Sequence, residues 1–375
     1  MKLCIVTHKV AKGDGQGRVN YEVAQAALQR GHQVTVIASQ VDEVLQHQPR
    51  FDWVPISVET LPTDLLKNLH FANQSARWLK THRTKFDLVK VNGAITWAAG
   101  DVNVAHFVHS AWLHSPAHVW QQRKDLYGLY QWLYTALNAR WERRAFAQSP
   151  QVIAVSAQVR DDLEKLGILR DRIQVIYNGV DTSEFYPGHS DRTALGLPDS
   201  VPLAIFAGDI RSSRKNLDSV LKALVKVSGL HLAVVGNVSG SPYPALAQEL
   251  AVDDRVHFVG YRQDMADLMR ASDFLVFPSR YETFGLVVLE AMASGIPVIT
   301  SAATPVAELL TDNAGIVLAD PDDVPTLVKE MQHLTHHPIH RQQMGIHARA
   351  IAEHHSWSQM AHHYIDLFEQ ISPPC

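Results

Sequence analysis

The sequence predicts an α/β fold made of two successive doubly wound domains, each with a parallel sheet covered by helices. A strand, a glycine-rich turn, a helix and a second strand follow one another at the N-terminus, and the same order returns after residue 202. Turn-forming residues cluster between the two, over residues 178–202. The chain has 375 residues, of which 46% are hydrophobic and 19% charged, so it is large enough to fill two cores.

The first domain begins with a β-α-β unit. Apolar runs at 3–6 and 33–38 predict strands, and the segment 19–29 between them places its apolar side chains on one helical face. Gly31 is expected to end this helix, because glycine adopts the left-handed conformation found just past helix ends. A short helical crossover of this kind joins parallel strands, so we expect a parallel sheet.

The second domain alternates strand and helix patterns in the same way. The predicted strands are 203–207, 231–235, 256–259, 274–277 and 297–300, and the predicted helices are 216–227, 265–270 and 285–293. A final helical pattern covers residues 355–371.

Charge and cysteine content narrow the class of protein. The net charge is −4, which argues against general nucleic-acid binding, because that function needs a basic surface. Two cysteines, Cys4 and Cys375, cannot form a disulfide framework, so we expect a reducing compartment. The N-terminal apolar run is too short for a signal peptide, and no run reaches the length of a transmembrane helix. We therefore expect a cytoplasmic protein.

Two glutamates flank the start of a predicted helix in the second domain. Glu282 lies in a polar loop after a buried strand, and Glu290 lies about two turns into the helix that starts near Phe284. The free amides at a helix start attract anions, and carboxylates bind sugar hydroxyls, so this arrangement suits a nucleotide-sugar. In the alternative interpretation, Glu282 caps the helix and Glu290 faces solvent. The spacing alone weighs the two equally.

A basic turn, residues 211–215, precedes the helix of the second β-α unit. Arg214 and Lys215 are placed to hold a diphosphate at the same edge of the sheet. Taken by itself, such a turn is more often a solvated loop with surface charges.

The glycine-rich turn Gly13–Gly17 matches neither a P-loop nor a dinucleotide fingerprint. It lacks the lysine of a P-loop, and Asn20 stands where a dinucleotide fingerprint has its third glycine. We interpret it as a flexible turn before a helix.

Four histidines, His106, His109, His114 and His118, lie close together in the first domain. No cysteine is near, and their spacing matches no zinc signature, so we expect no metal site there.

The segment 120–146 is aromatic and basic. It could form an amphipathic helix on an anionic membrane surface. We favour an ordinary domain helix with its aromatic side chains in the core, because the arginines cluster at one end.

Several of these segments together resemble family 4 of the retaining glycosyltransferases. The stretch that is similar to the E-x7-E signature of that family reads YETFGLVVLEAMASGIPVI. Further resemblances are GRVNYEVAQAALQRGHQVTVI, VIAVSAQVRDDL, VIYNGVD, RKNLDSVLKAL and HSWSQMAHHY. The resemblance implies a GT-B fold, in which two Rossmann-like domains face each other across a cleft. It implies an acceptor-side domain at 1–183, completed by a C-terminal helix at 357–375 that crosses back to it. The nucleotide-sugar-binding domain would be 184–356.

The resemblance also implies the roles of the donor-binding residues. Glu290 would bind the ribose hydroxyls, Glu282 would contact the donor sugar, and Arg214 and Lys215 would contact the diphosphate. Asp209 follows Gly208 where the family often has arginine, and Arg211 is the candidate substitute. The remaining donor-binding residues implied in this way are Thr283, Phe284, Gly285 and Leu286 for phosphate, Gly260 and Tyr261 for the base, and Gly15 and Gly17 for closure over the donor or acceptor.

For catalysis, the resemblance implies His109, Arg214, Lys215 and Glu282. His106 is an alternative to His109 near the acceptor, and Asp101 is a weaker acceptor-side candidate. We expect transfer of a sugar from a nucleotide-diphosphate sugar to a glycan, lipid-linked or small-molecule hydroxyl, with retention and without an obligatory metal or other cofactor. Such a reaction would serve cell-surface polysaccharide or glycolipid synthesis, with peripheral contact at the inner membrane surface as an additional interpretation. The alternatives are a nucleotide-sugar epimerase, a phosphorylase, or a non-catalytic nucleotide-sugar-binding protein.

Overall fold

The computed structural model describes residues 1–311 and 313–372 and divides the chain into two compact units. We call the unit formed by Met1–Asn178, together with the segment from Trp357 onward, the N-terminal domain. Gly179–Ser356 forms the C-terminal domain. The division thus falls shortly before the boundary expected after residue 183. Cys375 lies outside the described residues.

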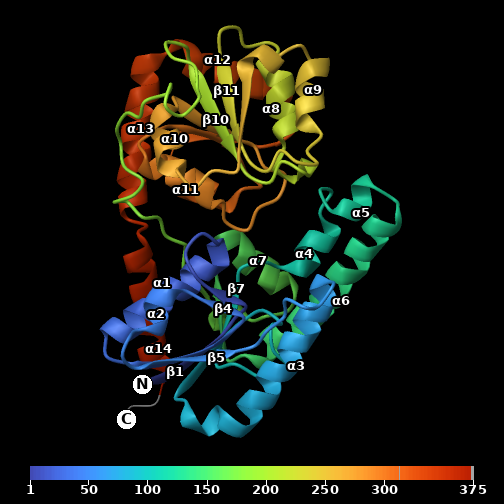
Figure 1. Cartoon of the computed structure of the whole chain (residues 1–375), viewed down its shortest axis with the longest axis vertical. Coiled ribbons are helices and arrows are strands. Elements are labelled where there is room, and N and C mark those ends of the chain that lie inside the picture. Colours follow the sequence, from blue (N-terminus) through green and yellow to red (C-terminus); the bar gives the residue numbers. More distant parts are fainter. Residues whose placement is uncertain (312, 373–375) are drawn as a thin grey trace. The chain divides into compact units, whose positions relative to one another are not determined.

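The N-terminal domain contains a seven-stranded parallel sheet (Figure 1). Its strands, in spatial order, are β5 (Phe51–Pro55), β3 (Gln33–Ala38), β1 (Lys2–Val6), β6 (Leu88–Asn92), β7 (Val102–Ala105), β8 (Gln151–Ala154) and β9 (Ile173–Val175). A separate two-stranded ribbon pairs β2 (Lys9–Val10) with β4 (Gln40–Val41). The order of the large sheet changes direction between β1 and β6, which is the place where open α/β sheets bind ligands.

Successive side chains of β1 point into two different cores, as the period of a strand requires. Leu3 and Ile5 belong to the core that includes α1 (Gly15–Gln29) and α7 (Ala157–Lys165). Cys4 and Val6 belong to the core that includes Phe71. The other helices of this domain are α2 (Glu43–Gln46), α3 (Asp64–His82), α4 (His109–His114), α5 (Val119–Gln122) and α6 (Leu126–Gln148), with 3₁₀ turns at Arg83–Lys85 and Arg170–Arg172.

The C-terminal helix α14 (Trp357–Ile371) completes the N-terminal domain, as the resemblance implied. It packs against α1 and buries Tyr364 and Phe368 in the same core as Val19 and Val23 (Figure 1). At its far end, Arg30 forms ion pairs with Asp366 and Glu369.

The C-terminal domain contains a second parallel sheet of six strands. Their spatial order is β12 (Val256–Gly260), β11 (His231–Val235), β10 (Leu203–Ala207), β13 (Phe274–Phe277), β14 (Val298–Ser301) and β15 (Gly315–Leu318). The helices are α8 (Leu217–Leu224), α9 (Tyr243–Glu249), α10 (Met265–Ala271), α11 (Leu286–Ala293), α12 (Val324–His336) and α13 (Pro338–Glu353), with 3₁₀ turns at Ser213–Lys215, Asp253–Arg255 and Pro305–Leu309. The strand order here changes direction between β10 and β13.

The prediction of two doubly wound, Rossmann-like domains is confirmed. The predicted flexible turn over Gly13–Gly17 is wrong in part. Helix α1 already begins at Gly15, because the Asp14 side chain caps it by accepting a hydrogen bond from the Gly17 amide at 2.6 Å.

Within the described residues, none of the helices combines the length and the apolar character needed to cross a membrane.

A close approach between α13 and the end of α11 requires glycine at position 345. A Cβ atom there would lie 2.0 Å from the carbonyl oxygen of Gly295. Gly345→Ala should therefore lower the free energy of unfolding by about 1–3 kcal/mol, the usual effect of overpacking a rigid contact. Urea denaturation followed by circular dichroism measures this change. Ile346→Ala is the matched control on the same helix, since Ile346 is exposed, and equal midpoints for the two variants would refute the packing explanation.

Candidate active site

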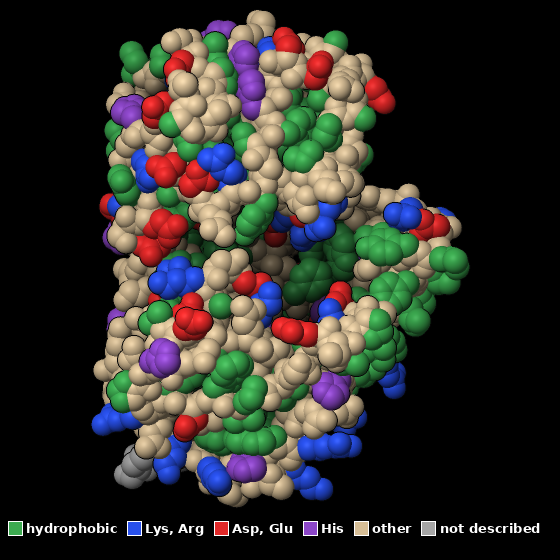
Figure 2. All heavy atoms as spheres, in the orientation of Figure 1, with side chains coloured by type: hydrophobic (Ala, Val, Ile, Leu, Met, Phe, Trp, Pro, Cys, Tyr) green, Lys and Arg blue, Asp and Glu red, His purple; other side chains and the backbone are tan. Residues whose placement is uncertain are grey.

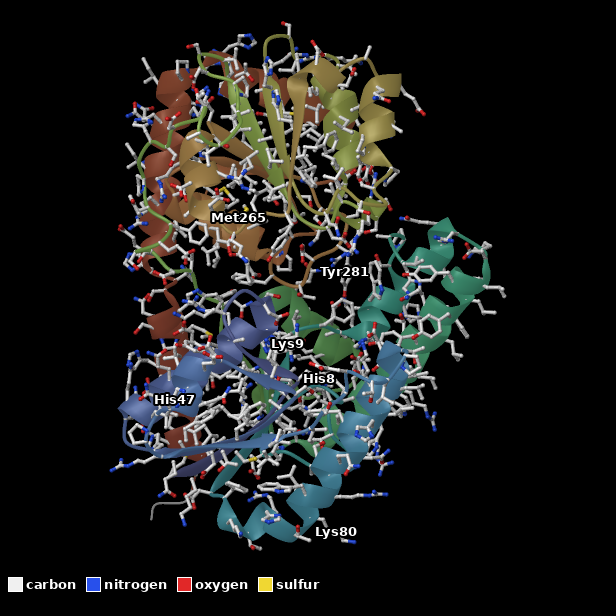
Figure 3. All side chains as sticks on the ribbon, viewed as in Figure 1. His8, Lys9, His47, Lys80, Met265 and Tyr281 are labelled. Atoms are coloured by element: carbon white, nitrogen blue, oxygen red, sulfur yellow. The ribbon has the colours of Figure 1, made fainter. Side chains whose placement is uncertain are left out.

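The site predicted in the C-terminal domain forms where two loops meet at the carboxyl ends of β10 and β13. The loop after β10 carries the 3₁₀ turn with Arg214 and Lys215, and the loop after β13 carries Glu282. Tyr281 in this second loop is labelled in Figure 3. Since the strand order changes direction between these two strands, the loops flank the crevice in which doubly wound sheets bind ligands.

Lys215 and Glu282 form an ion pair across the two loops. Lys215 is buried, and its ammonium lies 5.2 Å from the ring centre of Phe277. Burial and the nearby positive charge of Arg214 lower the pKa of Lys215, whereas Asp209 opposes this shift. The carboxylate of Glu282 also favours the charged form. The structure thus brings two of the predicted catalytic residues into direct contact.

Arg214 has no such partner. Its side chain is partly buried and forms no ion pair with any residue that the structure describes. Burial lowers the pKa of Arg214, while Asp209 and Tyr281 act in the opposite direction. A desolvated guanidinium without a counter-ion favours the binding of an anion beside it.

Arg211, the proposed substitute for the family's arginine, lies in the same loop after β10 and is paired with a carboxylate. It is exposed and forms an ion pair with Asp209, with 2.9 Å between its Nε and the carboxylate. Partial burial would raise the pKa of Asp209, but the hydrogen bonds from Arg211 hold it below its usual value. The structure therefore gives Arg211 a neighbouring carboxylate as its partner, and its diphosphate role stays a prediction.

Two residues that sequence reasoning missed hold the two loops together. Asn216 adopts the left-handed conformation, with φ of 65°, and its amide group donates to the carbonyl oxygens of Pro278 and Pro321. The Arg280 backbone amide donates to the Arg214 carbonyl at 2.9 Å, and its guanidinium pairs with Asp218. Their polar character in loops after strands was visible in the sequence, but their distant partners were not.

The phosphate-binding amides were expected at Thr283, Phe284, Gly285 and Leu286. Helix α11 begins at Leu286, and Gly285 precedes it in the left-handed conformation with φ of 99°. A Cβ on Gly285 would lie 2.5 Å from Thr304 Cγ2, so glycine is required here for both conformation and space. The Phe284 carbonyl accepts a hydrogen bond from Val306, which anchors the turn before the helix.

Glu290 lies inside α11 and is mostly buried. Burial raises the pKa of this carboxyl to about 7, and the negative charge of Glu184 adds to the shift. Glu290 is thus only partly exposed, which fits the alternative of a solvent-facing side chain less well than a binding role. A carboxylate that is costly to ionise in a buried place is stabilised by hydroxyl donors, which a ribose would supply.

The other glycines of this edge lie close to the same strand ends. Gly208 and Gly236 follow β10 and β11, and a Cβ on Gly236 would meet the Gly208 carbonyl oxygen at 2.4 Å. Gly260 ends β12 with φ of 75°, and Tyr261 after it is 74% exposed. The exposed ring is accessible to a ligand, while its contact with a base stays a prediction.

In the N-terminal domain, the structure adds Glu142 to the predicted His109. Glu142, on α6, is buried and accepts three hydrogen bonds of 2.9 Å, from the backbone amides of His109 and Ser110 and from His109 Nδ1. Since a carboxylate can only accept, Nδ1 carries the proton, and Nε2 of a neutral His109 is an acceptor. This pair could not be predicted, because His109 and Glu142 lie far apart in the sequence.

His106 and His109 both line a cavity of the N-terminal domain. The Nε2 atom of His106 is buried and has no hydrogen-bond partner within the described part of the chain. Burial, assisted by the charge of Lys90, lowers the pKa of His106 to about 3. His106 is thus a neutral group with an unused polar atom.

The acceptor-side role predicted for Asp101 needs correction. Asp101 precedes β7, at the amino end of the sheet, whereas His106 follows the same strand at its carboxyl end. Its carboxylate pairs with Arg83 at 2.7 Å and accepts a hydrogen bond from the Val89 amide. Asp101 therefore lies at the amino ends of the strands, opposite to the end where His106 lies.

Gly15 and Gly17 belong to the first turn of α1. An added Cβ on Gly17 would lie 3.0 Å from the Ala11 carbonyl oxygen. Close packing thus explains why position 17 is a glycine. The role of Gly15 and Gly17 in closing over the sugar donor or acceptor stays a prediction.

The interpretation that the aromatic side chains of 120–146 lie in the core is wrong for the first half of α6. This helix packs on α4 and α5, and Figure 2 shows hydrophobic side chains gathered over it. The exposed ones are Leu126, Tyr127, Leu129, Trp132 and Leu133. The sequence is apolar on several helical faces here, so periodicity could not assign one buried side.

No group of three metal-ligating side chains gathers anywhere in residues 1–311 and 313–372. His118 instead caps α5 and contacts Thr135 through Nε2.

Known families match both domains. The family described as "Glycosyltransferase Family 4" matches residues 13–184, and the family described as "Glycosyl transferases group 1" matches residues 189–351. Two Rossmann-like domains matched one by one in this way define a glycosyltransferase with the GT-B fold. Together the two matches cover most of the chain and show a protein that is similar to the GT-B glycosyltransferases of family 4.

A curated relative, the D-inositol 3-phosphate glycosyltransferase of Xylanimonas cellulosilytica, is 33% identical over 246 residues. The match covers 61% of this chain and 59% of the relative, so the chain spans little more than half of that protein's length.

Two solved structures show the same fold. WaaG, a glycosyltransferase involved in lipopolysaccharide biosynthesis, has a TM-score of 0.79 and 24% identity, with 98% of this chain and 99% of WaaG covered. HepE of Anabaena, solved in complex with UDP-glucose, has a TM-score of 0.73 and 19% identity, with 99% of this chain and 100% of HepE covered.

The raised pKa of Glu290 predicts how stability depends on pH. A folded-state pKa of about 7, above the usual 4.5, means that the folded protein holds this proton more tightly than the unfolded chain. The resulting stabilisation is complete below about pH 4.5 and is lost as the pH rises through 7. Glu290→Gln removes the titration, so the variant should gain stability over the parent by up to about 3 kcal/mol between pH 5 and pH 8.

Denaturant unfolding at both pH values measures this difference. Glu249→Gln is the control, because Glu249 is an exposed glutamate of the same domain. A pH-independent difference between Glu290→Gln and the parent would contradict the assigned burial of the carboxyl.

Proposed function

We propose that this protein is a retaining glycosyltransferase that moves a sugar from a nucleotide-diphosphate sugar to a hydroxyl group. The observation that carries this proposal is the cluster of Arg214, Lys215 and Glu282 at the carboxyl ends of β10 and β13. It supplies two cations for a diphosphate and a carboxylate for sugar hydroxyls at the place where this fold binds ligands.

The donor would be held from one end to the other by residues of the C-terminal domain. Glu290 would accept hydrogen bonds from the ribose hydroxyls, and the amides at the start of α11 would contact phosphate. Gly260 and Tyr261 would lie against the base. The structure of HepE, a neighbour of the same fold, was solved with UDP-glucose, which supports a nucleotide-sugar as donor.

Ligand binding would change the ion pair of the free protein. The diphosphate would take over Lys215, so Glu282 would become available to the hydroxyls of the donor sugar. Arg214, which has no counter-ion among the described residues, would gain one. These changes stabilise the charge that develops on the leaving group.

In the proposed reaction, the bond between C1 of the donor sugar and the diphosphate oxygen breaks, and its electron pair stays on the diphosphate. The acceptor oxygen forms its bond to C1 on the same face, which retains the configuration. The proton of the acceptor hydroxyl passes to the leaving diphosphate. Arg214 and Lys215 supply the positive charge, so no obligatory metal or other cofactor is proposed.

The acceptor would be a glycan, a lipid-linked sugar or a small hydroxylated molecule, in the synthesis of cell-surface polysaccharide or glycolipid. The likeness to WaaG, which is involved in lipopolysaccharide biosynthesis, supports this pathway class. The name of the Xylanimonas relative adds a phosphorylated cyclitol as a specific acceptor candidate.

Lys215→Ala is expected to lower kcat by roughly 10²–10³, because one preorganised group that stabilises developing charge is lost. Release of nucleotide diphosphate, measured with UDP, GDP and ADP sugars and a mixture of acceptors, reports the change. Lys226→Ala is the control, since Lys226 is an exposed lysine in the same domain.

Unchanged turnover in a folded Lys215→Ala variant would refute the role of this lysine. Mass analysis of the products separates the other outcomes. Interconversion of the donor indicates an epimerase, dependence on phosphate indicates a phosphorylase, and binding without release of nucleotide indicates a non-catalytic protein.

We further propose that the exposed apolar side chains of α6 contact an anionic membrane surface at the inner membrane. Leu126 is 87% exposed, and Trp132 and Leu133 are exposed nearby. Arg140, Arg143 and Arg144 are exposed further along the helix and match the charge of such a surface.

A variant with Leu126→Asp, Trp132→Asp and Leu133→Asp should lose most of its co-sedimentation with phosphatidylglycerol vesicles. Leu169→Asp is the control, because Leu169 is an exposed leucine elsewhere in the same domain. Equal binding of the triple variant and the control would contradict membrane contact through α6.

A further inference from the structure

A small cavity lies in the N-terminal domain at the switch between β1 and β6. His8 after β1 and Gly93 after β6 line it, together with residues of α4 and α6. His8 is labelled in Figure 3. The cavity has a volume of about 160 Å³, well below that of typical drug-sized sites. This space suits a single ring rather than an extended molecule.

The walls offer polar atoms suited to hydroxyl groups. His106 lines the cavity, and its buried Nε2 has no hydrogen-bond partner in the described chain; His109 lines it too and has a free Nε2, because Glu142 binds its Nδ1. Asn138 lines the cavity as well and donates through its amide nitrogen to the Tyr134 carbonyl oxygen. Imidazole and amide groups of this kind hydrogen-bond to neutral hydroxyls in either direction.

Aromatic side chains form another part of the wall. Trp97 and Trp141 pack edge to face, with ring centres 5.3 Å apart, and both line the cavity. Flat apolar walls with a few convergent polar atoms are typical of sites for small neutral molecules. A hydroxylated ring, with an apolar face and a polar rim, matches both features.

The cavity is poorly suited to a phosphate group. Among the described residues that line it, none is a lysine or an arginine, and Glu142 is a carboxylate. The amides of His109 and Ser110 at the start of α4 could bind an anion, but Glu142 already occupies them.

One lysine lies nearby without lining the cavity. Lys90 is completely buried, and its ammonium donates to the side-chain oxygens of Asn20 and Asn92. Burial lowers the pKa of Lys90 to about 7. Its N–H groups therefore donate to neighbouring amides, and the amine is only partly protonated at neutral pH.

We propose that this cavity binds an uncharged, polyhydroxylated ring of the acceptor and discriminates against a phosphorylated ring. The proposal rests on the glycosyl transfer proposed above and specifies its acceptor. The proposed acceptor therefore differs from the inositol 3-phosphate that the name of the Xylanimonas relative suggests.

The test uses the full chain with its donor and pairs of acceptors that differ only in a phosphate ester. Glucose with glucose 6-phosphate, and myo-inositol with myo-inositol 3-phosphate, are suitable pairs, along with the alkyl glucosides of the first pair. The neutral member of an accepted pair should have a kcat/KM at least about tenfold higher, because the phosphate must be desolvated beside Glu142 without a cation.

A cation added at the rim should weaken this preference. Gln16 lines the cavity from the first turn of α1 and is partly exposed. Gln16→Lys should shift the kcat/KM ratio toward the phosphate ester by about tenfold. Gln29→Lys is the matched control on the same helix, where Gln29 is exposed and does not line the cavity.

Preference of the parent protein for the phosphate ester, or acceptance of no neutral compound while the donor is still hydrolysed, overturns the proposal. An equal effect of Gln16→Lys and Gln29→Lys also contradicts it. Absence of any nucleotide release, with or without acceptors, counts instead against the proposed transferase function.

Discussion

The ion pair between Lys215 and Glu282 is the contact on which the C-terminal site depends. It joins the loop after β10 to the loop after β13 and keeps a buried ammonium beside a carboxylate. Asn216 and Arg280 hold the same two loops through backbone carbonyls, so the charged groups stand on a fixed frame. The free protein thus keeps Lys215 paired internally, and a diphosphate would exchange one anionic partner of Lys215 for another.

In the N-terminal domain, a buried carboxylate of the protein itself takes the place that an anion from solution could occupy. A helix start normally attracts anions from solution, but the buried carboxylate of Glu142 fills the start of α4. This internal anion also fixes the tautomer of His109. The two sheets therefore present opposite chemistry at equivalent positions, with unpaired positive charge in one domain and a neutral, hydroxyl-binding wall in the other.

The fold could be predicted from the sequence because its strands and helices are short, regular and repeated in one order. The predicted strand 203–207 coincides with β10, and the predicted helix 265–270 differs from α10 by one residue. The residues that come together at the C-terminal site were predicted for the same reason, since loops after parallel strands must meet at one edge.

The partner of His109 could not be predicted, because Glu142 lies on a helix whose placement depends on tertiary packing. Asp101 was misplaced because a sequence does not reveal that its loop returns to the opposite edge before β7. The exposed face of α6 was missed because apolar side chains predict burial only when they fall on one side of a helix.

The position of α14 has a consequence for how the chain is made. The C-terminal domain is inserted between two parts of the N-terminal domain, since the core around α1 takes Tyr364 and Phe368 from the last helix. During synthesis the ribosome releases the first part early, but the surface of α1 that receives this helix stays uncovered until residues beyond 356 have emerged. The inserted domain can become compact before its host is complete. Completion of the N-terminal core therefore waits until α14 has been synthesised.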